Sequence, residues 1–202
     1  MSDLIETIEA LEDIYGQPKV TSVAKVADRM VPVYRRWISA SNFCVLTTVG
    51  PEGTDGSPRG DEGPVVVEID PKTLAMPDWK GNDRVDSLRN IVRDGRVSLM
   101  FMVPGSDNVV RINGRACLSV AEDLVTRFER KGLVPRSVIL ITIDEVYFQC
   151  SRALMRSRLW TAGDQSEGLP TPGDILKEMT SGKAGGASYD AEWPKRAKES
   201  MW

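Results

Sequence analysis

The sequence of 202 residues contains no histidine. This absence excludes Ser-His-Asp hydrolysis, Cys-His proteolysis, zinc sites built on histidine and acid–base catalysis by imidazole. Histidine is also the side chain whose charge changes most readily near neutral pH. If the protein is an enzyme, its chemistry must therefore come from carboxylates, lysine, cysteine or tyrosine, or from a bound cofactor.

The sequence is also poor in cysteine. Its three cysteines, Cys44, Cys117 and Cys150, are far apart in the chain, odd in number and flanked by apolar residues. That pattern predicts buried, reduced thiols, and it is unlike a disulfide framework or a metal-binding cluster. We therefore expect no metal site.

Long apolar runs and an excess of positive charge are missing as well. No stretch approaches the roughly 18 apolar residues that a membrane-spanning helix needs, and the formal net charge is −3. A protein that binds nucleic acid through bulk positive potential is not expected. The first twenty residues are acidic and amphipathic, unlike a signal peptide, so we expect a cytoplasmic protein without a membrane or nucleic-acid partner.

Helical patterns occupy both ends of the chain. Apolar spacing predicts helices over 2–15 and 20–40, and Pro32 is expected in the first turn of a new short helix within the second region. A short helix over 121–132 and a capped helix in LPTPGDILKEMTSG are also expected. The polar C-terminal segment carries Trp193 and Trp202, which we expect to pack on the rest of the chain or across a dimer, because bare indole rings are costly in water.

Strand patterns fill the middle of the chain, over 43–49, 65–70, 73–78, 96–103, 108–120 and 137–150. The stretch from 50 to 60 is dense in turn formers and is expected as a turn that leads to the threshold of a strand. Helices do not alternate regularly with these strands, which disfavours a doubly wound sheet. The pattern predicts an α+β, mainly β protein built on a closed or nearly closed barrel.

One further helix is expected in GNDRVDSLRNIVRDG (81–95). Asn82 or Asp83 can cap its start, and Gly95 suits the left-handed position past its end. The spacing of four apolar residues predicts its buried face: Val85, Leu88, Ile91 and Val92.

Polar residues at the start of this helix suggest an anion site. An arginine there is poorly placed, because the amino end of a helix carries partial positive charge. Arg84 and Ser87 are three residues apart and are expected on one helix face, where they, Asn82 and free N–H groups would suit a phosphate. Gly81 would let the backbone approach closely. The alternative is a solvated helix start.

A second candidate for an anion clamp is Arg59 in SPRGDEGP (57–64), which stands between small, turn-forming residues at the threshold of a strand. An arginine held there on rigid backbone could bind a phosphate. It could equally be an ordinary surface charge, and the residues alone leave both interpretations open.

Four segments follow one another in a recognisable order. They are FCVLTTVGPEGTDGSPRGD (43–61), LAMPDWKGNDRVDSLRNIVRDGRVSLMF (74–101), VVRINGRACL (109–118) and VYFQCSRALMRSRLW (146–160). Together they resemble the pyridoxamine 5′-phosphate oxidase-like (oxidase-related) family of FMN-binding split β-barrels. The resemblance implies an FMN-binding split β-barrel over 31–162, flanked by an N-terminal helical segment (1–30) and a C-terminal helical tail (163–202).

The resemblance also implies a set of FMN-binding residues. Around the phosphate it implies Arg59, Arg84, Asn82 and Ser87. Along the isoalloxazine ring it implies two strand ends, Gly60, Asp61, Pro77 and Asp78. In such dimers the flavin lies at the subunit interface, which implies a third group from the second chain: Asn108, Arg111, Phe148, Gln149, Arg152 and Arg156. The alternatives are that Arg111 and Arg152 are surface charges and that Phe148 is a core residue.

Two departures separate this chain from the biosynthetic oxidases of that family. Those enzymes carry a lysine after the strand arginine, where this chain has the acidic GDEGPVVVE. They also carry a histidine in the closing segment, and this chain has none. Arg136 and Ser137 only faintly resemble their substrate-phosphate loop. The resemblance therefore implies a homodimeric FMN-dependent oxidoreductase that acts on an unidentified small molecule. A non-catalytic flavin carrier or sensor is the alternative, and a barrel without cofactor is the third.

Overall fold

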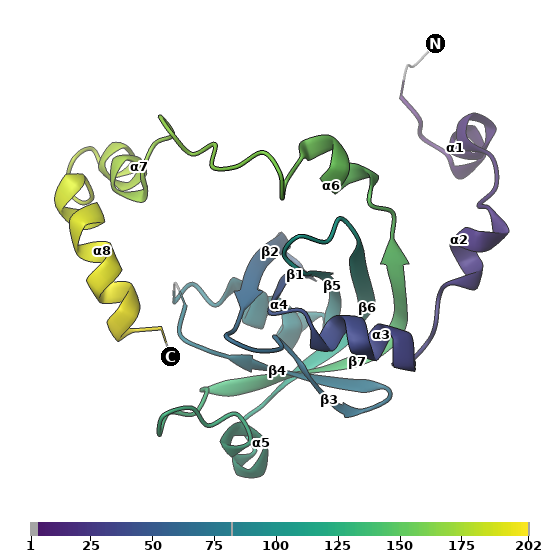
Figure 1. The fold of residues 1–202 in the computed structure, drawn as a ribbon, viewed down its shortest axis with the longest axis horizontal. Helices are drawn as coiled ribbons and strands as arrows, with labels where there is room; N and C mark the ends of the chain where they lie inside the picture. The colour runs from purple at the N-terminus through teal and green to yellow at the C-terminus, as the bar shows by residue number, and fades with distance from the viewer. Residues whose placement is uncertain (1–3, 82, 202) are drawn as a thin grey trace.

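The computed structural model describes residues 4–81 and 83–201. In this part of the chain the helices are α1 (Ile8–Tyr15), α2 (Val20–Ala24), α3 (Pro32–Ser39), α4 (Asp86–Arg93), α5 (Glu122–Thr126), α6 (Arg152–Ser157), α7 (Pro172–Met179) and α8 (Ala187–Glu199). The strands are β1 (Phe43–Gly50), β2 (Gly53–Gly60), β3 (Val67–Asp70), β4 (Thr73–Asp78), β5 (Arg96–Met102), β6 (Val109–Ser119) and β7 (Ser137–Gln149) (Figure 1).

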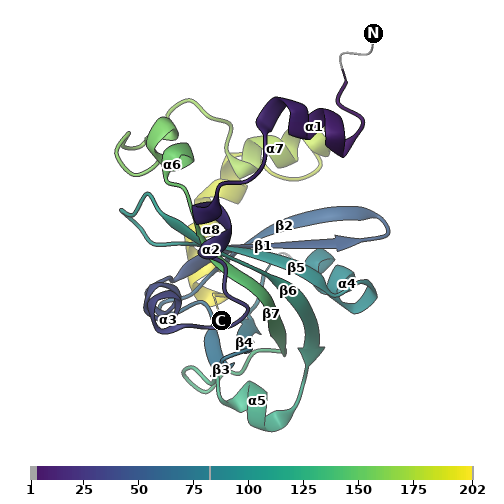
Figure 2. The same ribbon diagram turned by 90° about the vertical axis from the view of Figure 1, so that its right-hand side faces the viewer.

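The strands form one seven-stranded antiparallel sheet in the order β2-β1-β5-β6-β7-β4-β3. The sheet curls strongly, and the helices lie around its outside (Figures 1 and 2). The edge strands β2 and β3 are not paired with each other, so the barrel is open between them. The α+β, mainly β split barrel expected from the sequence is confirmed, with one strand more than the pattern predicted.

The additional strand is β2. Its sequence, GTDGSPRG, is dense in turn formers, yet it pairs with β1 along its whole length, from Gly50 opposite Gly53 to Phe43 opposite Gly60. Pairing with a strongly β-forming neighbour therefore overrides the local preference for turns. The edge position also accommodates Pro58, because a proline without an N–H is tolerated where only one neighbour pairs with the strand.

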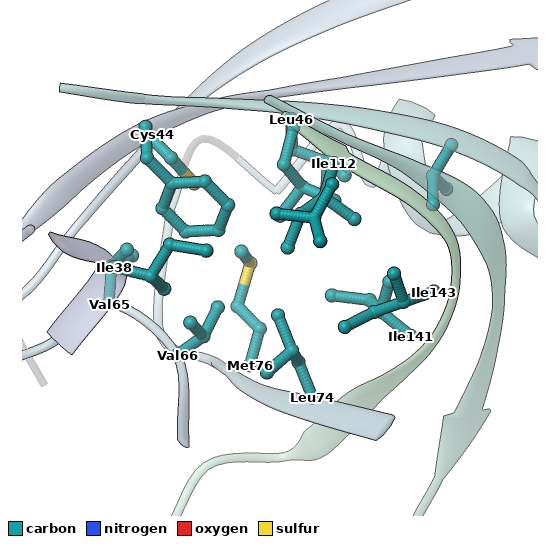
Figure 3. Close-up of a cluster of buried hydrophobic side chains, with 14 of the residues drawn as sticks. Ile38, Cys44, Leu46, Val65, Val66, Leu74, Met76, Ile112, Ile141 and Ile143 are labelled. Atoms are coloured by element: carbon teal, nitrogen blue, oxygen red, sulfur yellow. The ribbon is translucent and has the colours of Figure 1, made fainter. Parts of the chain in front are cut away.

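The hydrophobic core lies inside the curled sheet, with α3 at one side (Figure 3). Along β1 and β6 buried positions alternate with more exposed ones, as expected for strands with one face on the core. Several large side chains have almost no exposed surface: Ile38, Leu46, Leu74, Met76, Leu99, Phe101, Ile112, Ile139 and Ile141. This core fixes the curvature of the strands that carry the site.

The three cysteines are free thiols, but only one is in the core. Cys44 on β1 has no exposed surface. Cys117 and Cys150 are exposed, so the prediction that all three are buried is wrong. Cys117 lies on the outer face of β6, because strand alternation turns it away from the core, and Cys150 comes directly after β7.

Helix α4 begins later than the sequence pattern predicts. Its N-cap is Val85 and its first helical residue is Asp86. Asp83 and Val85 have φ angles of 59° and 53°, and this left-handed geometry ends any helical path before Asp86. Asp83 is therefore not the cap, and Asn82 lies outside the described residues. At the other end Gly95 has a φ of 76°, as predicted.

The buried face of α4 is more polar than its apolar spacing suggested. Two polar residues, Ser87 and Asn90, are buried beside Ile91. The predicted face is only partly correct: Ile91 is buried and Leu88 partly so, but Val85 is 42% and Val92 74% exposed.

The β1–β2 hairpin lies beside the helix (Figure 2) and explains this polarity, because its side chains provide polar partners. Asn90 Nδ2 donates a hydrogen bond to Thr48 Oγ1 at 3.1 Å, and both residues are buried. Gly50 makes room for this contact, because a Cβ at that position would collide with the side-chain amide of Asn90. Polar contacts therefore hold the helix against the hairpin, beside the apolar packing of Ile91 and Leu88 on the core.

The N-terminal helices project from the sheet. Neither α1 nor α2 contains a buried residue. Helix α1 is shorter than the predicted span, and the region from 20 to 40 forms two helices, with Pro32 in the first turn of α3 as predicted. Helix α5 covers only part of its predicted span. In residues 4–81 and 83–201 no helix has the length and apolar character needed to cross a membrane.

The C-terminal tail forms two helices that pack on each other. Thr171 and Asp174 form a capping box at the start of α7, as the sequence indicated. Asp190 on α8 accepts hydrogen bonds from Thr171 Oγ1 at 2.6 Å and from the N–H of Gly173 at 2.8 Å. Trp193 is 53% exposed, so much of its surface is not packed against the rest of this chain. Its packing across a dimer stays a prediction, and Trp202 lies outside the described residues.

Candidate functional site

A pocket of about 750 Å³ lies between β2, the end of β4 and the start of α4. Most of the residues that the sequence assigned to the flavin within one chain line it: Arg59, Gly60, Asp61, Pro77, Asp78 and Ser87. The two faint candidates Arg136 and Ser137 line it as well. The fold thus brings together strand ends and a helix start that are far apart in the sequence.

The pocket lies at the opening of the split barrel. Strand β2 is one edge of the sheet, and β4 is next to the other edge. Arg59 on β2 and Asp78 on β4 form an ion pair, with Nη1 2.6 Å from Oδ1. Their side chains are only 18% and 16% exposed. This ion pair therefore bridges two strands that no backbone hydrogen bonds connect.

Arg59 retains an unsatisfied donor. Its Nε is buried and has no hydrogen-bond partner among the described residues. A buried polar group without a partner costs about 1–3 kcal/mol. An anionic group in the pocket would supply an acceptor that the described protein atoms do not, so the residues present fit a phosphate or carboxylate ligand at this point.

The start of α4 contributes a second polar element to the pocket wall. Val85 provides no side-chain acceptor for the first-turn N–H groups, and such groups at a helix start attract anions. Ser87 is buried in the first turn, and its hydroxyl donates a hydrogen bond to Asp55 Oδ2 on β2. The hydroxyl predicted to serve a phosphate is therefore already engaged by a carboxylate of the protein.

Arg84 is placed differently from the prediction. Because the helix begins at Asp86, Arg84 precedes it and does not share a helix face with Ser87. Its Nε lies 2.7 Å from Asp86 Oδ2, its side chain is 74% exposed, and it does not line the pocket. Asn82, assigned to the same phosphate, lies outside the described residues.

Asp61 is a fixed part of the wall. Its side chain is 3% exposed and forms an ion pair with Arg130, whose Nη2 lies 2.7 Å from Oδ1. The N–H of Glu62 donates to the same oxygen at 2.6 Å, and Trp79 Nε1 donates to Oδ2 at 3.4 Å. These donors satisfy the carboxylate, so Asp61 anchors the loop after β2 beside the pocket.

Several lining residues were not predicted from the sequence, including Asp55, Trp79, Lys80, Asp86 and Met201. A signal for Asp55 was present. Asp55, Ser57 and Arg59 are two residues apart and therefore share one face of β2, and all three line the pocket. The pattern was hidden because this stretch was expected as a turn. Met201 shows that the C-terminal tail reaches the same pocket, and no local sequence signal indicated this.

The six residues expected from a second chain lie away from the pocket in this chain. Arg111 donates to Gln149 Oε1 at 3.3 Å and to Ser98 Oγ at 3.4 Å. Phe148 is 46% exposed, so it is not a core residue, and Lys25 lies 4.5 Å from its ring centroid. The others, Asn108, Arg152 and Arg156, are exposed. Their contribution from a partner subunit stays a prediction.

The chemistry that the pocket offers by itself is limited. Cys44 lies opposite Arg59 in the β1–β2 register, but burial raises the pKa of its thiol to about 12, against the opposing charge of Arg59. It therefore remains a protonated thiol and a poor nucleophile near neutral pH. The described residues contain no group of three or more carboxylates and thiols that could hold a metal ion. Any redox chemistry here must come from a bound molecule.

Comparison with known proteins identifies the family. Residues 30–150, more than half of the chain, match the profile of the family described as pyridoxamine 5′-phosphate oxidase. The chain belongs to this family. The matched range contains the pocket residues of β2, β4 and α4, and it ends just after β7. No curated protein sequence matches the chain.

Several solved structures of low sequence identity are similar to this member of the family. HupZ from Group A Streptococcus is 16% identical, with a TM-score of 0.47 and coverage of 58% of this chain and 92% of that chain. A candidate pyridoxamine 5′-phosphate oxidase from Lactobacillus delbrueckii is 21% identical, with a TM-score of 0.48 and coverage of 60% and 95%. The FAD binding protein from Mycobacterium smegmatis is 11% identical, with a TM-score of 0.42 and coverage of 61% and 97%.

Proposed function

We propose that this member of the pyridoxamine 5′-phosphate oxidase family binds FMN in the pocket and, as a homodimer, uses it to oxidise or reduce a small molecule. The observation that carries the proposal is the buried Nε of Arg59, a donor without a partner among the described residues. Arg59 lines a pocket of about 750 Å³, a size within the usual range for small-molecule and cofactor sites.

The residues present can be divided by what they would hold. Arg59 and the N–H groups in the first turn of α4 would bind the phosphate, since both favour negative charge. Gly60 ends β2 and Pro77 is the second-last residue of β4, and both would lie along the ring without a charged side chain of their own. Asp61, held by Arg130, would keep the first of these strand ends in position.

Bound FMN would supply two-electron transfer, chemistry that these side chains cannot perform. The protein would bind the cofactor, orient it and exclude water from one side of it. A redox role also agrees with the absence of histidine, because hydride transfer to a flavin does not require a protein base at the reacting atom. The protonated thiol of Cys44 is not positioned to act as a nucleophile, since it is fully buried.

The proposal does not extend to oxidation of pyridoxamine phosphate. Where the biosynthetic enzymes carry a lysine for the substrate phosphate, this chain has an acidic stretch. Two of its carboxylates, Asp61 and Glu62, line the pocket. Both carboxylates are paired with Arg130, and the stretch has no cation in place of that lysine to hold a substrate phosphate, so a substrate without a phosphate fits better.

A non-catalytic flavin carrier or sensor is the second candidate. The pocket wall favours it in one respect: its residues are engaged with one another, as Arg59 is with Asp78 and Ser87 with Asp55. None of them is an evident proton donor to a substrate. The two functions differ in one measurable property, the rate at which NADH or NADPH reduces bound flavin compared with free FMN.

The first test is whether the purified protein retains flavin. Wild-type protein is mixed with FMN, desalted and examined for visible flavin absorption, beside Arg59→Ala and Arg115→Ala. Arg115 is an exposed strand arginine that does not line the pocket, so it is the matched control. We expect wild type and Arg115→Ala to retain FMN and Arg59→Ala to lose it. A protein that neither retains FMN nor changes its fluorescence would contradict the proposal.

A further inference from the structure

Helix α4 is held against the β1–β2 hairpin by three polar contacts on one face of the helix. Its residues are spaced three apart, and each reaches the hairpin: Ser87 to Asp55, Asn90 to Thr48, and Arg93 to Glu52. The Ser87–Asp55 contact belongs to the pocket wall, whereas Glu52 and Arg93 do not line the pocket. One of the three contacts that hold the helix against the hairpin therefore lies inside the candidate site.

The direction of the Ser87–Asp55 hydrogen bond limits what Ser87 can do. A hydroxyl has a single hydrogen to donate, and Ser87 donates it to Asp55 Oδ2. While that bond lasts, Ser87 has no proton for a ligand phosphate. Asp55 also places a negative charge beside the same helix start, where it opposes the approach of an anion.

Arg59 differs from Ser87 in this respect. Its guanidinium binds Asp78 through Nη1, while Nε stays without a partner among the described residues. Arg59 can therefore accept an anion without giving up Asp78. Ser87 can bind an anion only if it gives up its hydrogen bond to Asp55. The two phosphate-binding residues assigned by resemblance, Arg59 and Ser87, are therefore not equivalent in this chain.

We propose that Asp55 determines the specificity of the site toward the charged end of its ligand. It competes with a ligand phosphate for Ser87 and repels the dianion, so that the phosphate is held by Arg59 and the first-turn N–H groups of α4 without Ser87. The site then prefers FMN over flavins without a phosphate less strongly than it would with the Ser87 hydroxyl free. This inference rests on the proposed flavin-binding function.

The variant Asp55→Asn tests the competition directly. Asparagine has nearly the same shape and can donate to Ser87 Oγ, which releases the hydroxyl proton for a phosphate and removes the negative charge. The measured quantity is the ratio of the dissociation constants for riboflavin and FMN, obtained by flavin fluorescence titration. We expect the ratio to rise roughly tenfold from wild type to Asp55→Asn, as one hydrogen bond to a charged group would produce.

Two further variants make the result specific. Glu52→Gln changes the net charge equally and weakens another contact between the same hairpin and α4, outside the pocket. We expect it to leave the ratio at the wild-type value. Adding Ser87→Ala to Asp55→Asn should abolish the rise, because the gain passes through the freed hydroxyl.

The outcomes separate this inference from the function on which it rests. If both flavins bind and the ratio is the same in wild type, Asp55→Asn and Glu52→Gln, the role of Asp55 is overturned while flavin binding stands. An equal rise in Glu52→Gln overturns it too, because bulk charge would then be the cause. If neither flavin binds wild type or any variant, the proposed function fails and this inference falls with it.

Discussion

Arg59 and Asp78 form an ion pair across the opening of the split barrel. They lie 19 positions apart in the sequence, on an edge strand and on the strand next to the opposite edge, with Nη1 2.6 Å from Oδ1. Backbone pairing holds every neighbouring strand of the sheet, but it does not connect these two. The side chains that line the candidate site therefore also connect the two sides of the barrel.

The first prediction concerns the stability that this bridge provides. Asp78→Asn leaves the guanidinium of Arg59 largely buried without a counter-charge. We expect a loss of about 1–3 kcal/mol in the free energy of unfolding, somewhat below the usual cost of breaking a fully buried pair because both side chains keep some exposure. Urea unfolding followed by tryptophan fluorescence measures it.

The matched control for this prediction is Asp28→Asn. Asp28 pairs with Lys72 at 2.8 Å, but their side chains are 62% and 49% exposed. An exposed pair contributes little, so we expect a much smaller change than in Asp78→Asn. Equal losses in the two variants would mean that Arg59 and Asp78 do not bridge the barrel in solution.

A second prediction tests the polar contacts between α4 and the β1–β2 hairpin. In Gly50→Ala the new methyl group collides with Asn90, whose amide is hydrogen-bonded to Thr48. We expect a loss of about 1–3 kcal/mol in the free energy of unfolding, the usual cost of overpacking. Gly56→Ala on the same hairpin is the control, because nothing lies within 4 Å of the added carbon. A loss in both variants would point to the glycine backbone and not to Asn90.

The buried face of α4 can be tested with two adjacent residues. Ile91 is 4% exposed and Val92 is 74% exposed, although the apolar spacing of the sequence placed both on the inner face. Ile91→Ala should lower the free energy of unfolding by about 2–4 kcal/mol and Val92→Ala by less than about 0.5 kcal/mol. Chemical denaturation of the two variants measures the difference. Comparable losses would support the face that the sequence predicted and contradict the structure.

The strands with strong apolar or alternating patterns were predictable from the sequence. β7 and β6 begin and end within about a residue of their predicted spans, because long runs rich in valine and isoleucine have one stable arrangement in a sheet. β2 was not predictable by that route. Its glycines, proline and aspartate form a strand because β1 pairs with it across a tight turn, and it lacks the apolar or alternating pattern by which the other strands were predicted.

The candidate site was likewise only partly predictable from the sequence. Arg59 and Ser87 were assigned from motifs and both line the pocket, whereas Arg84 was placed on a helix that begins two residues later. The left-handed backbone at Asp83 and Val85 caused that difference. Valine rarely adopts such geometry, so nothing in the sequence indicated it. Tertiary constraint, and not local preference, decided where the helix starts.

A further prediction concerns the reactivity of the three thiols. Cys117 and Cys150 are exposed, while Cys44 is fully buried with a pKa raised to about 12. A thiol reagent at pH 8 should therefore modify two cysteines quickly in the folded protein and the third only after unfolding, as counted by intact mass. Rapid labelling of all three in the native protein would contradict the burial of Cys44.

The raised pKa of Cys44 also has a consequence for stability. In the unfolded chain this thiol ionises near its ordinary pKa of 9.0, whereas in the folded protein it stays protonated up to about pH 12. The folded state then binds more protons than the unfolded state in that window, so its contribution to stability is complete below pH 9 and is lost as the pH rises toward 12. Between pH 9 and pH 10.5, wild type should therefore lose more unfolding free energy than Cys44→Ala, measured by urea denaturation. Parallel curves for the two proteins would show that Cys44 ionises as readily in the folded state as in the unfolded one.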